Sequence, residues 1–364
     1  MPPGASAKAP ASESIASSPP TIAVVVLAHR RERYLADAVR SVLNQTVPRD
    51  RYEIVVTKAF RSEPVDRLLE ENQIPALFDP EPRYGRKLAR AVDATRAPFV
   101  TILEDDDLFE PDRLARVLQL VAVHPDLGYY HNRPSGITPD GDPLPRGKWQ
   151  PQEVDADLDR AGAMWIPPAE KVSHAADLLR GASWFNVSSI AVRRELLVRA
   201  PKRYYQEVVM TSMDAFLCGL AWVSPYGIFL DDRRLTRYRH HPADFAMNIQ
   251  TGRQGIADVR SIVEMMEDAG SAEGLHWVNS IIEESWKWLY LNNVKQSMRT
   301  GAPRAEVLRK AGAYARFVLR HPRWLRERGA WQSGADVAVY LLAPGRVERK
   351  LNPPPAVFPG TPPN

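Results

Sequence analysis

The stretch Phe99-Val100-Thr101-Ile102-Leu103-Glu104-Asp105-Asp106-Asp107 decides the fold class, because an apolar strand runs directly into four acidic residues. A continuous apolar, β-branched run suits a strand buried on both faces, as in a parallel sheet. Ligands of such sheets bind beyond the carboxyl ends of the strands. Adjacent carboxylates repel one another unless a cation neutralises them, and Mg²⁺ and Mn²⁺ prefer oxygen ligands. The stretch therefore predicts a metal site at a strand end. A solvated acidic turn before the next helix is the alternative.

The chain before this stretch alternates between strand-like and helix-like patterns. Strands are predicted at 21–27, 53–56, 76–78 and 99–103, with helices near 35–43, 65–71 and 86–95 between them. Such alternation implies right-handed βαβ units and a mostly parallel α/β sheet flanked by helices.

The pattern changes after His124. Many Gly, Pro and Asp residues predict loops over 128–168, and apolar runs predict strands at 184–192 and 226–230 with a helix over 210–222 between them. From Gly252 onward the pattern is helical, and Leu308, Ala311, Ala315 and Leu319 form one stripe. We predict a Pro/Ala/Ser-rich tail (1–20), an α/β domain (21–248), a helical region (249–345) and a Pro-rich tail (346–364).

Composition limits the class of protein. With 364 residues, 44% hydrophobic and 25% charged, the chain is globular and long enough for about two domains. A net charge of +4 does not suit a polycation that binds nucleic acid. The single cysteine, Cys218, excludes an intramolecular disulfide and a cysteine zinc cluster, and its apolar neighbours predict a core thiol. No run approaches the ~18–20 apolar residues of a membrane span, and no signal peptide is apparent, so we expect a cytoplasmic protein.

Positive charge gathers near the C-terminus. Residues 301–350 contain eleven Lys/Arg and four Asp/Glu, interleaved with aromatic residues. This mixture suits peripheral contact with the cytoplasmic face of a membrane, an oligomer contact, or a solvated helix face.

Three motifs resemble those of family 2 glycosyltransferases, which have the GT-A fold. The segment Leu103–Asp107 resembles the Leu-Asp-x-Asp-Asp motif of that family. The segments 25–31 and 41–46 resemble its opening strand and its Ser-Val-Leu-x-Gln helix end, and 85–95 has its spacing. The resemblance covers about residues 21–245.

The resemblance implies roles for these positions. Asp106 would coordinate Mn²⁺ or Mg²⁺ on the donor diphosphate, and Glu104 would approach the ribose. The implied donor-binding set is Ala28, Arg30, Glu32, Thr57, Arg86, Glu104, Asp105 and Arg239. The family commonly reads Val-Asp-Asp-Gly-Ser where this chain reads Val56-Thr57-Lys58-Ala59-Phe60, so the donor base is not predicted. We expect Lys58 to be a solvated charge, with contact to a phosphate as the alternative.

Downstream positions complete the implied site. Asp214, near the start of a predicted helix, would be the general base, with Glu207 as the alternative. Leu235–Pro242 resembles the Tyr-Arg-x-His segment of the family, which places His241, or His240, at the metal. Trp184 and Asn186 lie on the implied acceptor side.

The resemblance thus implies an inverting, metal-dependent glycosyltransferase that moves a sugar from a nucleotide-diphosphate donor to a hydroxyl. The acceptor would be a glycan, a lipid-linked molecule or a small molecule. A non-catalytic sugar- or lipid-binding relative is one alternative. A sugar nucleotidyltransferase is another, although no glycine follows the first strand to form a phosphate-binding loop.

Overall fold

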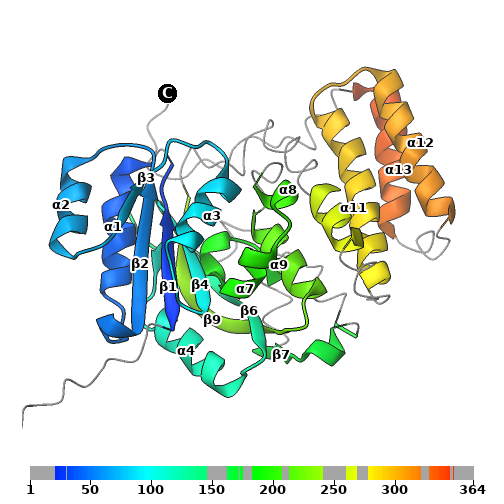
Figure 1. Cartoon of the computed structure of the whole chain (residues 1–364). Coiled ribbons are helices and arrows are strands. Elements are labelled where there is room, and N and C mark those ends of the chain that lie inside the picture. Colours follow the sequence, from blue (N-terminus) through cyan, green and yellow to red (C-terminus); the bar gives the residue numbers. More distant parts are fainter. Residues whose placement is uncertain are drawn as a thin grey trace, which may run out of the picture.

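A nine-stranded sheet with the strand order β3-β2-β1-β4-β8-β6-β9-β5, and with β7 beside β9, forms the centre of the molecule (Figure 1). The computed structural model describes residues 21–29, 31–145, 162–171, 173–174, 183–206, 213–240, 260–268, 278–320, 328–344 and 347. The first strands and helices are β1 (Ile22–Leu27), α1 (Glu32–Leu43), β2 (Tyr52–Lys58), α2 (Glu63–Glu71), β3 (Ala76–Phe78), α3 (Tyr84–Asp93) and β4 (Phe99–Glu104).

The first four strands are parallel, as predicted. β1 pairs with β2 and β4, and β2 pairs with β3. In this register Leu27 lies opposite both Thr57 and Glu104. The carboxyl ends of three strands therefore meet at one edge of the sheet, where the acidic residues begin.

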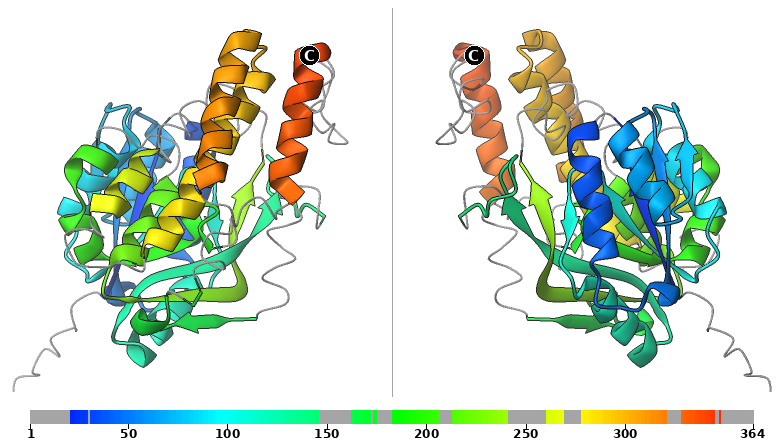
Figure 2. Two further views of the ribbon diagram at one scale, coloured as in Figure 1. Left: turned by 90° about the vertical axis from the view of Figure 1, so that its right-hand side faces the viewer. Right: turned by 90° about the vertical axis from the view of Figure 1, so that its left-hand side faces the viewer.

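Helices cover both faces of the sheet (Figure 2). Successive side chains of a strand point to opposite faces, and in the buried strands the side chains on both faces are apolar, so each face needs a cover of helices. On one face Val25 packs in a core with Leu88 of α3 and with Phe216 of α9 (Met213–Val223). On the other face Val24 packs in a core with α1, α2 and α4 (Arg113–Val123). The α/β fold class is confirmed.

The remaining strands make the sheet mixed. They are β5 (Leu108–Phe109), β6 (Leu127–Ile137), β7 (Met164–Ile166), β8 (Ile190–Arg193) and β9 (Gly227–Arg239), and the short helices α7 (Arg194–Arg199) and α8 (Lys202–Tyr205) follow β8. β6 is parallel to β9 and antiparallel to β8, and β4 is antiparallel to β8.

The prediction of loops over 128–168 is wrong at its start, because β6 is a long interior strand. Its buried polar side chains find partners on other elements: Arg113 Nε donates to Asn132 Oδ1 at 3.1 Å, and the His131 ring contacts the Phe185 carbonyl at 2.8 Å. Pro134 is tolerated in the strand because the register shifts beside it. Such pairings across the sheet are not visible as periodicity.

Two further boundaries differ from the prediction. β9 continues beyond the predicted strand end at Leu230 as far as Arg239, which pairs with Ile137 of β6. The strand expected over 184–192 begins only at Ile190, because residues Val187–Ser189 form a single 3₁₀ turn.

The Ser-x-x-x-Gln motif at the end of α1 has a structural role. Gln45 Nε2 donates to the Ser41 and Glu110 carbonyls at 3.1 and 2.8 Å, and its Oε1 accepts from Leu114 N at 2.9 Å. The side chain of Ser41 accepts from Phe109 N at 3.1 Å. The motif fastens α1 to the segment that follows the acidic residues.

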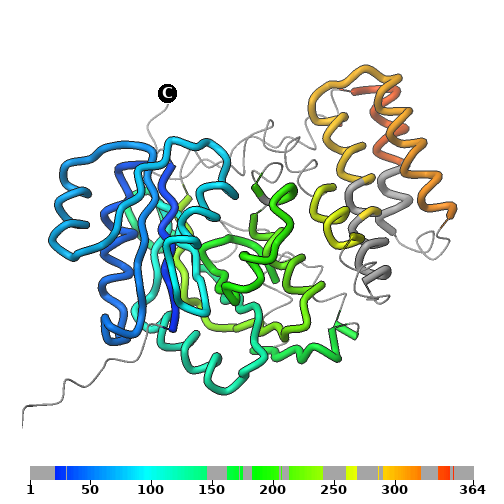
Figure 3. The backbone as a smooth tube through the Cα atoms, in the orientation of Figure 1, coloured from blue at the N-terminus to red at the C-terminus, as the bar shows by residue number. Residues whose placement is uncertain are grey.

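Three helices, α11 (Val278–Arg299), α12 (Arg304–Arg320) and α13 (Arg328–Leu342), form a group beside the sheet (Figures 1 and 3). Val294, Val307, Tyr314 and Tyr340 are members of its core. Of the predicted stripe, Ala311 packs against this core, but Leu308 and Leu319 point outward and are 50% and 68% exposed. Val307 and Tyr314 are buried instead. Residues 262–266 pack into the core that also contains α3 and α9.

Other expectations concern single residues and segments. Cys218 is buried and has no disulfide partner, as predicted, and burial raises its pKa to about 12. Among the described residues, no helix combines the length and apolar character needed to traverse a bilayer. The predicted tail 1–20 lies outside the described residues, as does 346–364 apart from Val347.

Candidate active site

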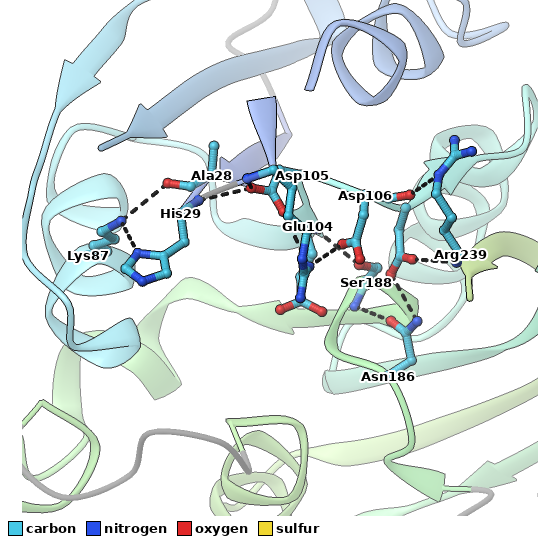
Figure 4. A network of polar contacts seen from close by, with 11 residues as sticks. Ala28, His29, Lys87, Glu104, Asp105, Asp106, Asn186, Ser188 and Arg239 are labelled. Carbon is cyan, nitrogen blue, oxygen red and sulfur yellow. Dashed lines mark hydrogen bonds and ion pairs between the residues drawn. The ribbon is translucent and has the colours of Figure 1, made fainter. Parts of the chain in front are cut away.

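The four acidic residues lie where β4 ends, at the carboxyl edge of the parallel strands (Figure 4). The chain turns tightly there, with Asp107 N donating to the Glu104 carbonyl at 3.3 Å. Asp105, Asp106 and Asp107 are only 2%, 5% and 0% exposed. The cluster is therefore not a solvated acidic turn.

Asp105 and Asp106 face the loop that follows β1. Asp105 accepts from His29 N at 2.9 Å and from Arg31 N at 3.3 Å. Arg31 Nη1 lies 3.3 Å from Asp105 Oδ1 and 2.6 Å from Asp106 Oδ1. Arg31 thus supplies positive charge to two of the carboxylates, a role that the sequence did not suggest.

Asp107 connects the acidic turn to the opposite side of the site. Its Oδ1 accepts from Arg239 N at 3.0 Å, and its Oδ2 accepts from Asn186 Nδ2 at 2.9 Å. Arg239 Nε donates to the Asp106 carbonyl at 2.8 Å, and its guanidinium lies 4.6 Å from the centre of the Tyr34 ring. These contacts make the buried Arg239 a support of the acidic turn, and its predicted contact with the donor phosphate stays a prediction.

The carboxylates oppose one another's ionisation. Burial and the neighbouring Asp106 raise the pKa of Glu104 well above its ordinary value and also raise that of Asp105, against the lowering effect of Arg31. Burial, followed by Asp106, raises the pKa of Asp107 to about 7. In the described part of the chain, the positive charge near the cluster is therefore too small to offset the repulsion among its carboxylates.

Three of these residues are arranged as metal ligands. One carboxylate oxygen each from Glu104, Asp106 and Asp107 lies within 4.8 Å of the others. Carboxylate oxygens crowded together in this way suit a hard divalent cation, which would neutralise their mutual repulsion. The donor set therefore fits Mn²⁺ or Mg²⁺ and does not resemble a nitrogen- or sulfur-rich transition-metal site.

Asn186 joins the acidic cluster to the predicted base. It donates from Nδ2 to Asp107, and its backbone N–H donates to Asp214 Oδ2 at 3.3 Å. Asp214 lies in the first turn of α9 and also accepts from Ala215 N at 2.8 Å. Asn186 has a positive φ of 72°, and its Oδ1 accepts from Ser188 N at 2.6 Å. The tight turn thus lets Asn186 donate hydrogen bonds to both Asp107 and Asp214.

The other predicted residues are spread around this edge. Ala28 is buried and bonded to the Thr57 carbonyl, while Glu32 is exposed at the start of α1. Thr57 is fully buried, and its hydroxyl has no hydrogen-bond partner among the described residues. Arg86 pairs with Glu81 at 3.4 Å, and Trp184 is half-buried against the core.

Some predictions cannot be placed. Arg30, His241 and the alternative base Glu207 lie outside the described residues. The ring of His240 makes an edge contact with Tyr238, with 5.0 Å between ring centres. The expectation that Lys58 is solvated is wrong: it is buried and lies 2.5 Å from Asp66, because α2 brings that carboxylate over the end of β2.

Two residues of α3 lie beside these groups although the sequence analysis did not select them. The buried Lys87 amine lies 3.2 Å from the Ala28 carbonyl and 3.2 Å from His29 Nδ1 (Figure 4). The Tyr84 hydroxyl is buried without a hydrogen-bond partner among the described residues. Burial, followed by the charges of Glu104 and Asp214, raises its pKa well above the ordinary value. The sequence did offer a signal for Lys87, because it lies one turn before Ala91 on the apolar face of α3, where a lysine is unexpected.

Comparison with known proteins agrees with this geometry. Residues 23–161 match the sequence model described as glycosyl transferase family 2. These residues are a family 2 glycosyltransferase domain. The domain contains β1 to β6 and the whole acidic cluster. EpsH of Bacillus subtilis (strain 168), whose name describes a glycosyltransferase, is 23% identical over 113 residues, which are 30% of this chain and 32% of EpsH. The alignment thus spans about a third of that relative.

Solved structures share the fold of the family 2 domain and of the region after it. S. aureus TarS superposes with a TM-score of 0.54 at 12% identity, covering 91% of this chain and 55% of TarS. The mannosyltransferase PcManGT from Pyrobaculum calidifontis, in complex with GDP-Man and Mn²⁺, gives 0.50 at 16% identity, covering 91% and 88%. TarS 1-349 in complex with UDP-GlcNAc gives 0.50 at 12% identity, covering 88% and 91%. At these identities the similarity establishes the GT-A fold.

Proposed function

We propose that this chain is an inverting, metal-dependent glycosyltransferase that transfers a sugar from a nucleotide-diphosphate donor to a hydroxyl group. The observation that carries the proposal is the pair of contacts made by Asn186. Through them the candidate metal ligand Asp107 and the candidate base Asp214 are bonded to the same residue. A donor held at the metal and an acceptor held at the base would then be adjacent.

Glu104, Asp106 and Asp107 would hold Mn²⁺ or Mg²⁺. When bound, the cation supplies positive charge that stabilises the departing nucleoside diphosphate. Arg31 would share in binding the diphosphate charge, because its guanidinium already lies beside Asp106. The relatives named above that were solved with GDP-Man and UDP-GlcNAc support a nucleotide-sugar donor, without naming its base or sugar here.

Asp214 would act as the general base. Its carboxylate takes the proton of the acceptor hydroxyl while that oxygen forms its bond to the anomeric carbon. The bond from that carbon to the diphosphate oxygen breaks, and the electron pair leaves with the nucleoside diphosphate. Attack from the face opposite the leaving group inverts the anomeric centre. The two backbone N–H groups that bond to Asp214 fix the direction of its carboxylate.

The acceptor is a hydroxyl of a glycan, of a lipid-linked molecule or of a small molecule in this proposal. Asn186 and Trp184 remain our candidates for its binding, since both lie in the segment that precedes the 3₁₀ turn beside Asp214. A non-catalytic sugar-binding protein is the second candidate, and a single observation favours it. Thr57 stands where the resemblance expects a base-binding carboxylate.

A thermal-shift panel tests the proposal. UDP, GDP, dTDP and CDP are each added with and without Mn²⁺, because a ligand that binds only the folded state raises its stability by mass action. We expect one nucleotide to raise the melting temperature only when Mn²⁺ is present. Asp106→Ala should abolish that shift. The matched control is Asp37→Ala, an exposed carboxylate on α1 that pairs with Arg40.

The outcomes separate the candidates. A metal-dependent shift that survives in Asp37→Ala and is lost in Asp106→Ala supports the proposed site. Equal shifts in wild type and Asp106→Ala would contradict it. If a nucleotide sugar binds but no nucleoside diphosphate is released over time, the sugar-binding alternative is favoured instead.

A further inference from the structure

Helix α12 carries an exposed face on which an apolar stripe is bordered by arginines. At 3.6 residues per turn, the stripe consists of Ala305, Leu308, Gly312, Ala315 and Leu319, with Arg309, Arg316 and Arg320 along one border and Arg304 on the other. Leu308 and Leu319 are 50% and 68% exposed. The opposite side of the helix contains Val307, Tyr314 and Val318, which pack in the core of the helical group. The exposed leucines are therefore not needed for that core.

The charge of this face has one sign. Glu306, the acidic residue of α12, lies on another side of the helix and pairs with Lys310 at 2.8 Å. The arginines at 304, 309, 316 and 320 are all exposed. An apolar stripe between arginines is the arrangement of helices that lie in the plane of a membrane surface, with long cationic side chains reaching to the headgroups.

The neighbouring helix adds apolar surface. On α13 the exposed residues Ala335, Ala338, Val339 and Leu342 follow one another on a single face, with Leu342 85% exposed. Both helices stand on the side of the molecule away from β1 and β2 (Figure 1). Leu319 and Leu342, 68% and 85% exposed, are the two most exposed large apolar side chains in the described part of the chain.

The arginines favour one occupant over the others. In a two-fold contact the same patch faces itself, so a second copy of this chain would bring guanidinium groups toward guanidinium groups. A bilayer that contains anionic lipids offers phosphate charge for the arginines and apolar volume for the leucines at the same surface. We infer that the exposed face of α12 is a docking surface for anionic membranes. This inference does not depend on glycosyl transfer.

Sedimentation with vesicles tests the inference on the full chain. One set of vesicles contains phosphatidylglycerol and phosphatidylcholine, and the other contains phosphatidylcholine alone. We expect binding to the anionic vesicles only, and release at about 1 M salt, where charges are screened within a few ångström.

Two variants separate charge from apolar contact. Arg309→Gln/Arg316→Gln/Arg320→Gln should weaken binding to anionic vesicles about a hundredfold, because each arginine near such a surface contributes about fivefold. Leu308→Ser/Leu319→Ser should weaken it at least about tenfold through lost apolar burial. Circular dichroism should show unchanged helicity and melting for both, because these side chains lie outside the core.

Matched controls lie outside the helical group. Arg40→Gln/Arg51→Gln/Arg67→Gln removes the same charge from exposed positions of the family 2 domain, and Val123→Ser/Val198→Ser removes two valines that are 63% and 51% exposed. Both controls should bind as wild type does. Equal binding of the α12 variants and wild type would overturn the inference. So would a dimer, seen by analytical ultracentrifugation, that the leucine variant dissociates while vesicles are not bound.

Discussion

Asp107 gives the crowded acidic turn a measurable pH signature. Burial and Asp106 raise its pKa from an ordinary 3.8 to about 7 in the folded protein. Between these values the folded state binds a proton that the unfolded state lacks. The resulting stabilisation is present below about pH 4 and is lost as the pH rises through 7. At 1.36 kcal/mol per pKa unit the loss is about 3 kcal/mol between pH 4.5 and 8.

The pH dependence of wild-type stability must be compared with that of Asp107→Asn, because other groups titrate in the same range. Burial lowers the pKa of His131 to about 4, which makes stability rise with pH over part of the same range. This contribution is common to both proteins and cancels in their difference. The variant also loses a hydrogen bond, because an amide nitrogen cannot accept from Asn186 Nδ2. That cost shifts the level of the curve but not its slope.

Urea unfolding without divalent metal, at a series of pH values, measures this difference. The free energy of unfolding of wild type minus that of Asp107→Asn should fall by about 3 kcal/mol from pH 4.5 to pH 8. Added Mn²⁺ should reduce the fall, because it binds the ionised carboxylates that form at high pH. A difference that is flat or that rises with pH would refute the reasoning from burial and crowding.

Three further predictions concern buried polar side chains. Lys171 is buried, and its Nζ donates to the Ala221 and Ser224 carbonyls at 2.7 Å. Burial lowers its pKa to about 7 from 10.5, so the stability of wild type should rise relative to that of Lys171→Met by about 3 kcal/mol from pH 7 to 10. Urea unfolding at both pH values checks this, and a flat difference would contradict it. Gln45→Ala should lower the free energy of unfolding, measured with urea, by about 2–3 kcal/mol, because three hydrogen bonds are lost. Gln45→Glu can still accept from Leu114 N but cannot donate to the Ser41 and Glu110 carbonyls, so it should recover only part of this loss. Tyr84→Phe should raise the melting temperature slightly, because its hydroxyl has no partner in the described region, and should weaken binding of the nucleotide sugar; unchanged affinity would remove Tyr84 from the site.

Local patterns were sufficient for the parallel half of the fold. β1 and β4 are nearly continuous apolar runs, and such runs are typical of parallel strands that are buried on both faces. The acidic residues follow β4 without a gap, so their place at the edge of the sheet followed from the strand itself. The same reasoning failed for β6, whose polar side chains are satisfied by Arg113 and by other strands.

The parts of the site that the sequence analysis missed are set by long-range contacts. Arg31 meets Asp105 and Asp106 from a separate loop, and Lys87 reaches the end of β1 from α3. Lys58 resembled a solvated charge until α2 placed Asp66 above it. In α12 both Leu308 and Val307 fit a helical stripe, and only the packing of α11 and α13 decides which of them is buried.

Release of nucleoside diphosphate from a nucleotide sugar, with and without Mn²⁺, tests the central claim most directly. The donor is the one whose nucleotide gave the metal-dependent thermal shift. Wild type should release product only with the metal, and Asp214→Asn should be slower by about 10²–10⁴-fold while keeping the same nucleotide shift. Equal release by wild type and Asp214→Asn, or release that persists at the same rate after chelation of the metal, would contradict the account.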